Sequence, residues 1–244
     1  MKKILTLLLI TPVALMVSCE KNNPQPDTGT TVQKGIAKGK VTNANGSPII
    51  NANVVIENTV FYASYVHAVT NAKGEYSVQV PNGSWKASVQ IEKVFEGNTY
   101  KFDLHPDNEN PFAGTEGAVR NFTWKLSGAK PGGGFYGSTV AVYPDILSGI
   151  SEQDIELKLV PVGNLADGST GATITKKLAD AGGGEYGVTD VPVGKYIISA
   201  RNTSTNQPLE IRRRNTGNFA SELNAVFAAG YTGSTHYQIV TEVK

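Results

Sequence analysis

The chain has 244 residues, enough for two domains of about 100 residues each after an N-terminal targeting segment. Abundant Gly, Val, Thr and Tyr favour short strands and tight turns, and no long amphipathic or heptad stretch indicates a helical bundle. The formal net charge of +1 gives no electrostatic basis for nucleic-acid binding, and the single cysteine, Cys19, excludes an intramolecular disulfide.

An apolar stretch at the N-terminus ends at this cysteine. Lys2-Lys3 precede an apolar segment over residues 4–17, which is too short and too one-sided in its flanks for a transmembrane helix. Residues 1–18 resemble a bacterial lipoprotein signal peptide, with Met16 where leucine is usual. The resemblance implies lipid attachment at Cys19 and anchoring in the outer membrane, on its periplasmic or its cell-surface face. An ordinary secretory peptide with a chance cysteine is the alternative.

Residues 19–34 hold few large apolar side chains, so they cannot bury enough surface to fold. They are predicted to form a flexible tether that lifts the folded part of the chain off the membrane.

Residues 35–130 are predicted to form a first β domain, because apolar and polar residues alternate along most of them. The expected strands begin at Gly39, before an Asn-Gly turn, and continue at residues 52–56, 62–70, 76–80, 85–91, 98–104 and 118–126, with a polar loop at 105–117.

The hairpin over residues 71–89 has a second copy about 110 residues later in the chain. Gly74-Glu75-Tyr76 and Pro81-Asn82-Gly83 supply its turns, and Trp85 stands two residues after the second turn. Gly184-Glu185-Tyr186, Pro192-Val193-Gly194 and Tyr196 repeat this order. Two copies of one hairpin predict two similar β domains in tandem.

The order Gly39-x-Val41, Gly46-x-Pro48, Thr70 to Tyr76 and Pro81 to Trp85 resembles the carboxypeptidase regulatory-like domain over about residues 36–92. Asn71, Tyr76 and Trp85 stand where that family often has Asp, Phe and Tyr. The resemblance implies a transthyretin-like, also called prealbumin-like, β-sandwich of about seven strands.

Residues 131–244 are predicted to form a second prealbumin-like sandwich. The glycine run after Lys130-Pro131 marks its boundary, because consecutive glycines interrupt a strand. The fold class is therefore all-β, with two tandem antiparallel β-sandwich domains. Its expected strands cover residues 138–143, 154–161, 172–178, 185–201, 209–213, 219–227 and 235–243. Arg212-Arg213-Arg214 alternate in direction, which indicates a solvated or edge strand rather than a basic patch.

No residue pattern indicates catalysis or a cofactor. A zinc site like that of carboxypeptidases needs a closely spaced His and Glu plus a distant His. The three histidines are His67, His105 and His236, and the residues three positions after them are Thr70, Asn108 and Ile239. The sequence also lacks G-x-S-x-G, P-loop and H-E-x-x-H motifs. We therefore expect a protein that is not an enzyme.

The oxygen-rich segment from Asp103 to Asn110 has the ligand type of a calcium site. Its spacing is not that of an EF-hand, and polar loops are common for solvation alone. Solvation is the preferred reading, and no metal site is predicted.

Three aromatic residues lie close together at Phe61, Tyr62 and Tyr65. Tyr62 and Tyr65 have opposite parity on a strand, so one of them should face outward and could stack on a sugar ring. Core packing is the preferred role for most of these rings, as it is for Trp85 and Trp124.

Two functional hypotheses follow for a lipid-anchored pair of sandwiches. The first is a non-enzymatic outer-membrane lipoprotein that binds or scaffolds a protein partner. The second is a glycan-binding accessory lipoprotein of a carbohydrate-uptake system. An exposed coplanar pair of rings in a groove would favour the glycan, and an apolar patch or an open sheet edge would favour the protein partner.

Overall fold

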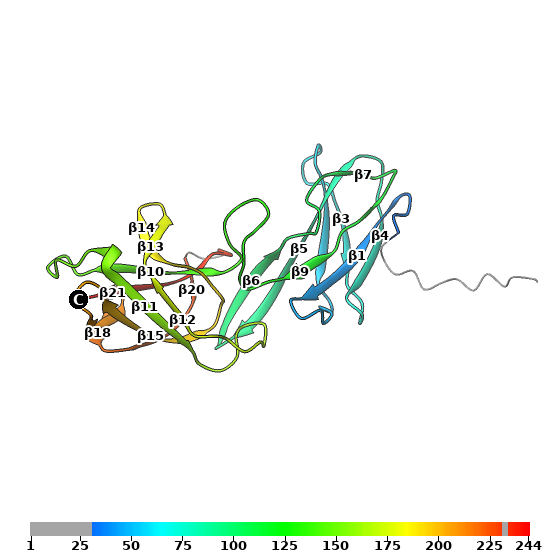
Figure 1. Ribbon diagram of the computed structural model, residues 1–244. Coiled ribbons are helices and arrows are strands. Elements are labelled where there is room, and N and C mark those ends of the chain that lie inside the picture. Colours follow the sequence, from blue (N-terminus) through cyan, green and yellow to red (C-terminus); the bar gives the residue numbers. More distant parts are fainter. Residues whose placement is uncertain (1–30, 231–233) are drawn as a thin grey trace, which may run out of the picture.

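The computed structural model describes residues 31–230 and 234–244. The predicted signal peptide, the lipid-attachment residue Cys19 and most of the predicted tether lie outside the described residues. Figure 1 shows two β-sandwiches in a row, the first coloured blue to green and the second green to red.

The first sandwich is built from two sheets. One has the strand order β4-β1-β8, with β9 also paired to β1, and the other has the order β3-β2-β5-β6, with β7 paired to β5. Its strands are β1 (Ile36–Asn43), β2 (Asn53–Asn58), β3 (Tyr65–Val69), β4 (Glu75–Gln79), β5 (Ser84–Phe95), β6 (Asn98–Leu104), β7 (Phe112–Ala113), β8 (Ala118–Val119) and β9 (Phe122–Trp124). Both sheets supply large buried side chains, among them Tyr76 and Phe122 from one and Trp85 and Tyr100 from the other.

The second sandwich follows the same plan. One sheet has the order β13-β14-β10-β21-β17-β18, with β20 paired to β21, and the other has the order β12-β11-β15-β16, with β19 paired to β15. Its strands are β10 (Ser138–Pro144), β11 (Ile155–Pro161), β12 (Ile174–Lys177), β13 (Ala179–Gly182), β14 (Glu185–Val191), β15 (Lys195–Asn202), β16 (Gln207–Leu209), β17 (Ile211–Arg213), β18 (Thr216–Ala220), β19 (Leu223–Val226), β20 (Ala228–Ala229) and β21 (Tyr237–Val243). A short 3₁₀ helix, η1 (Glu152–Asp154), precedes β11.

The predicted all-β class is confirmed, and most strand pairs are antiparallel. The exceptions are parallel: β1 pairs with β8 and β9, and β10 pairs with β21. In each case several strands separate the two partners in sequence, and such a long connection allows parallel pairing. A local strand pattern does not show this direction.

The family pattern of the first domain has a physical explanation at Arg120. A Cβ atom at residue 39 would lie 1.9 Å from the Arg120 carbonyl oxygen, so only glycine fits there. The Tyr76 hydroxyl donates to the same oxygen at 2.7 Å, and burial raises the pKa of Tyr76. Tyr76 therefore adds a hydrogen bond that a phenylalanine at this position could not make.

The two predicted hairpins are equivalent in structure. Trp85 Nε1 donates to the Pro81 carbonyl at 2.9 Å, and the Tyr196 hydroxyl donates to the Pro192 carbonyl at 2.9 Å. Both rings are buried, and burial raises the pKa of Tyr196 to about 12. The predicted core roles of Trp85, Trp124 and Tyr196 are confirmed.

Among the described residues, three hydrogen bonds and one ion pair join the β5–β6 hairpin of the first sandwich to the second sandwich. The Tyr100 hydroxyl donates to the Phe227 carbonyl at 2.8 Å. The Tyr237 hydroxyl bridges the backbone of Lys101, accepting from its N–H at 2.5 Å and donating to its carbonyl at 3.0 Å. Lys195 pairs with Glu96, at the tip of the β5–β6 hairpin that reaches toward the second sandwich in Figure 1, at 2.9 Å. The sandwiches therefore meet in a specific interface, whereas the domain limits 35–130 and 131–244 stay a prediction.

Candidate functional site

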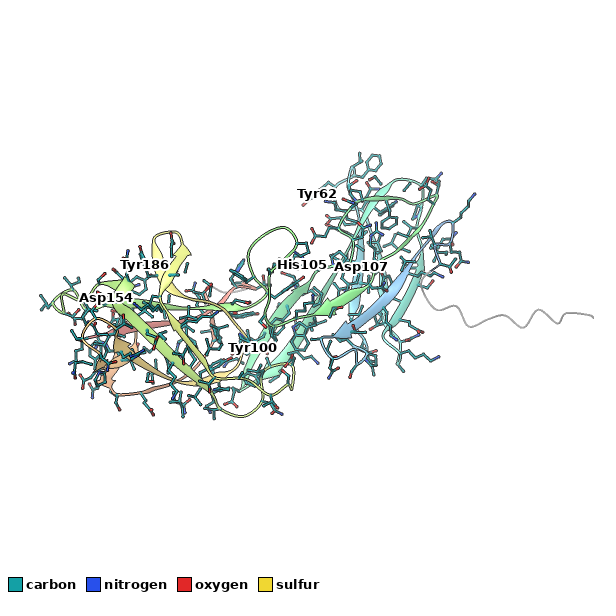
Figure 2. All side chains as sticks on the ribbon, viewed as in Figure 1. Tyr62, Tyr100, His105, Asp107, Asp154 and Tyr186 are labelled. Atoms are coloured by element: carbon teal, nitrogen blue, oxygen red, sulfur yellow. The ribbon has the colours of Figure 1, made fainter. Side chains whose placement is uncertain are left out.

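Three consecutive large apolar side chains of the first sandwich are exposed on one loop, residues 59–64, which we call the apolar loop. Val60 is 72 % exposed, Phe61 68 % and Tyr62 99 %. Figure 2 shows Tyr62 at an outer end of the first sandwich. The prediction that these aromatics mostly fill the core is wrong, and so is the expected start of a strand at residue 62, because β3 begins only at Tyr65.

Hydrogen bonds from the flanking strands hold the apolar loop. The side-chain oxygen of the buried Asn58 accepts from the Val60 and Phe61 N–H groups, at 2.9 Å each. The Asn58 N–H donates to the Ser64 carbonyl at 2.9 Å. These hydrogen bonds fix the backbone of the apolar loop in a turn that leaves its apolar side chains outside the core.

Strand β3 continues the exposed surface beyond the loop. Within the part of the chain that the structure describes it pairs only with β2, so its outer edge has no strand partner there. Tyr65 is 46 % exposed and Val69 60 %. The Tyr65 ring lies 6.2 Å from the His67 ring, and no ring contact joins Tyr62 to Tyr65 among the described residues. The sequence-predicted stacking residues are therefore both exposed but do not form a paired platform.

The oxygen-rich segment over residues 103–110 is held by internal hydrogen bonds. Gln90 donates to the Asp103 carboxylate at 2.8 Å, and the Asn121 side chain donates to Asp107 at 2.8 Å. His105 Nδ1 lies 2.9 Å from the Glu109 carboxylate. In the described part of the chain no three His, Cys, Asp or Glu residues gather where they could hold a metal ion.

A cleft of about 500 Å³ lies where the two sandwiches meet. Side chains from both halves line it, including His105 from the first and His236 from the second. Domain interfaces are frequent places for ligand sites, and this volume is typical of them. The sequence did not predict the cleft, because its walls come from segments far apart in the chain.

The glycine run that the sequence marks as a boundary is an ordered turn on the rim of this cleft. Lys130 N–H donates to the Gly134 carbonyl at 3.0 Å. The Asp190 carboxylate accepts from Gly128 N–H at 2.9 and 3.0 Å and from Gly137 N–H at 3.1 Å. Asp190 thereby fixes both ends of the segment 128–137, which carries several of the lining residues.

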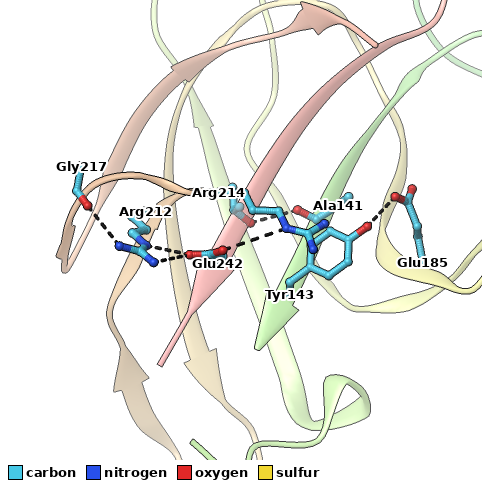
Figure 3. Close-up of polar contacts among 8 residues, drawn as sticks. Ala141, Tyr143, Glu185, Arg212, Arg214, Gly217 and Glu242 are labelled. Atoms are coloured by element: carbon cyan, nitrogen blue, oxygen red, sulfur yellow. Dashed lines mark hydrogen bonds and ion pairs between the residues drawn. The ribbon is translucent and has the colours of Figure 1, made fainter. Parts of the chain in front are cut away.

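Two of the three consecutive arginines, Arg212 and Arg214, form part of a polar network on one sheet, shown in Figure 3. Arg212 and Arg214 pair with Glu242 at 2.6 and 4.0 Å. Arg213 points elsewhere and donates to the Val226 carbonyl at 3.0 Å, as the alternation predicted. The edge-strand alternative is wrong, because β17 pairs with both β18 and β21.

The same network includes a tyrosine of the neighbouring strand. The Tyr143 hydroxyl donates to Glu185 at 2.5 Å, and this hydrogen bond raises the pKa of Tyr143. The Arg214 guanidinium lies 3.4 Å from the centre of the Tyr143 ring. Because each charge has a partner, the network is best explained as a brace across the strands of the sheet.

In the ranges 31–230 and 234–244 no helix has the length and hydrophobicity needed to cross a membrane.

Comparison with solved structures finds weak likenesses. The Bacillus anthracis TIE protein is 15% identical, with 86% of this chain and 34% of that chain covered and a TM-score of 0.34. This chain thus spans about a third of that relative. A DUF3823 family protein from Bacteroides ovatus is 8% identical, with 79% and 99% covered and a TM-score of 0.25. The major pilin of Streptococcus pyogenes is 12% identical, with 87% and 98% covered and a TM-score of 0.26. These scores are too low to support a functional argument.

The search of curated proteins found no match. The family model of the carboxypeptidase regulatory-like domain matches residues 37–111, which span β1 to β6 of the first sandwich and the loop before β7. The matching family is a regulatory-like domain rather than a catalytic one. The resemblance to the carboxypeptidase regulatory-like domain that the sequence pattern predicts is therefore confirmed for residues 37–111.

Proposed function

We propose that this chain is a non-enzymatic lipoprotein of the bacterial outer membrane that binds a protein partner through the apolar loop and the open edge of β3. The observation that carries the proposal is the exposure of three consecutive large apolar side chains, 68 to 99 %, on a loop held by hydrogen bonds.

A protein partner suits this surface better than a glycan does. Apolar side chains gathered at the surface mark interaction sites, and large aromatic side chains provide contact area at a low cost in conformational entropy. The adjacent edge of β3 offers unpaired backbone groups to an added strand. A glycan-binding platform would need paired rings in a groove, whereas Tyr62 projects from a loop and Tyr65 from an edge strand.

The apolar loop lies at the end of the sandwich where the tether joins. Ile36 N–H donates to the Gln33 carbonyl, and a Cβ at Gly117 would meet the same carbonyl at 2.0 Å. Gly114 N–H in turn donates to Gly83, which packs beside Asn58 at the base of the loop. The apolar loop and the end of the predicted tether are therefore linked by a continuous series of contacts.

A photo-crosslinking amino acid in place of Tyr62 tests the partner surface in cells that express the chain. We expect one discrete adduct of higher mass, whose partner mass spectrometry identifies as a protein. The matched control is the same amino acid in place of Leu147, a residue that is 94 % exposed on a loop of the second sandwich. Equal adducts at both positions, or none at residue 62, would contradict the proposal, and an adduct to polysaccharide would support the glycan alternative.

The anchor has a separate test. Because Cys19 is the only thiol and ends the apolar segment, we expect Cys19→Ala to shift the protein from the membrane fraction to the soluble fraction. Metabolic labelling with a fatty acid should mark the parent chain and not the variant. Membrane fractionation that does not change on substitution would rule out lipid anchoring and leave the partner surface to be judged by the crosslink alone.

A further inference from the structure

The cleft between the sandwiches has a cationic wall that the partner surface does not use. The ammonium group of Lys125 lies 5.4 Å and that of Lys130 5.8 Å from the centre of the Tyr136 ring. All three residues line the cleft. Neither lysine forms an ion pair among the described residues, whose ion pairs involve other cations. Two ammonium groups therefore share one ring and have no carboxylate to neutralise them.

The acidic groups in the cleft accept hydrogen bonds from uncharged side chains. Asp103 accepts from Gln90 at 2.8 Å, and Glu185 accepts from the Tyr143 hydroxyl at 2.5 Å. Both carboxylates thus have hydrogen-bond donors within the protein. His105, edge-on to Tyr136 with 5.6 Å between the ring centres, has its Nδ1 against Glu109. An incoming carboxylate could form charge-assisted hydrogen bonds with the two lysines, whereas the acids of the lining already accept hydrogen bonds from the protein.

The rest of the lining indicates what carries that carboxylate. Ser138, Thr139 and Gln238 bring hydroxyl and amide groups, which can both donate and accept hydrogen bonds. Phe135 also lines the cleft, with its side chain 47 % exposed. Hydrogen-bonding groups around an available aromatic face suit a molecule with many hydroxyl groups and a ring that has an apolar face. A sugar ring has both features.

The walls are fixed before any ligand arrives. Asp190 holds the segment 128–137 at both ends, and the Tyr237 hydroxyl holds the backbone of Lys101, next to the lining residue Phe102. Gly137 allows the close approach, because a Cβ there would lie 2.5 Å from the Asp190 backbone. A pre-formed site loses less conformational freedom on binding, which favours affinity.

We propose that this cleft binds an acidic saccharide, with the carboxylate of a uronic acid residue between Lys125 and Lys130 and a sugar ring against Phe135. The site is independent of the partner surface on the apolar loop, because it lies at the other end of the first sandwich and uses none of the same residues.

Isothermal titration of the chain from residue 20 onward tests the site with trisaccharides of galacturonic, mannuronic and glucuronic acid, and with the neutral galactose trisaccharide as the uncharged comparison. We expect saturable binding of at least one acidic trisaccharide, no binding of the neutral one, and weaker binding as salt is added. The Lys125→Met/Lys130→Met variant should lose at least about tenfold in affinity, because charge-assisted hydrogen bonds are lost.

The control variant is Lys158→Met, which removes an exposed lysine that does not line the cleft and should bind as the parent does. Thermal melts confirm that both variants fold. Failure of all three acidic trisaccharides to bind would overturn the proposal. It would equally be overturned by equal affinity for the neutral sugar, or by a double variant that binds as tightly as the parent. None of these results bears on the crosslink at Tyr62.

Discussion

Replacing Trp85 with alanine should lower the free energy of unfolding by about 3–5 kcal/mol, a large part of the about 5–15 kcal/mol that holds a typical domain folded. Trp85 is 3 % exposed in the first sandwich, and its indole N–H is satisfied by the Pro81 carbonyl. Alanine would leave a large cavity and an unpaired carbonyl, and both effects destabilise the domain. Urea unfolding followed by circular dichroism measures the loss.

Trp85→Tyr is the matched control. Tyr196 shows that a tyrosine at the equivalent position of the second hairpin reaches the corresponding proline carbonyl, at 2.9 Å. A tyrosine at 85 should therefore keep the hydrogen bond to Pro81 and much of the packing, and cost much less than alanine does. If Trp85→Ala cost less than about 1 kcal/mol, as surface substitutions do, the residue would have to be exposed in solution. That result would make Trp85 a candidate binding residue.

The two hairpins could be predicted from the sequence because neighbouring residues determine their turns and strands. Asn71 shows this in the first hairpin: its side-chain oxygen accepts from Lys73 and Glu75 N–H at 2.8 and 3.0 Å, the same turn chemistry that aspartate provides. The strand alternation around Tyr76 and Trp85 corresponds to one buried face. Local turn residues and a period of two are enough to define such an element.

The apolar loop escaped prediction for the opposite reason. Tyr62 begins the strand that alternation predicts, and core packing is the usual role of large aromatic residues such as Phe61 and Tyr62. The buried Asn58 ends β2 and closes the loop, so the aromatic residues after it project from the sandwich. A buried side-chain cap of this kind depends on the packing around it, which no local pattern records.

The cleft and the interface were not predictable from local patterns at all. Tyr100 and Tyr237 belong to strands that are far apart in sequence, but their ring centres lie 4.8 Å apart. The hydroxyl group of each donates a hydrogen bond to a backbone carbonyl of the other sandwich. Residues 101 and 237 are more than half the chain apart. These residues come together only because one sandwich packs against the other. The same packing brings the walls of the cleft together.

Because the two sandwiches share an interface, a cavity in the second sandwich can also affect the stability of the first. We expect Tyr196→Ala to destabilise the second sandwich by about 3–5 kcal/mol, since Tyr196 is 1 % exposed and donates to Pro192. Tyr196→Phe keeps the ring and loses one hydrogen bond, so it should cost about 1 kcal/mol. The difference between the free energies of unfolding of the two variants measures the cost of the cavity alone.

Both tryptophans, Trp85 and Trp124, lie in the first sandwich, so tryptophan fluorescence follows that half while circular dichroism follows the whole chain. The Tyr196 ring packs edge-on against Phe227, whose carbonyl accepts the interface hydrogen bond from Tyr100. If the halves are separate domains, the circular dichroism of Tyr196→Ala should show an early transition that fluorescence does not follow. If instead both signals shift together, the interface joins the halves into one cooperative unit, and the predicted division at residues 130 and 131 would not hold. A loss below about 1 kcal/mol would contradict the buried position of Tyr196 itself.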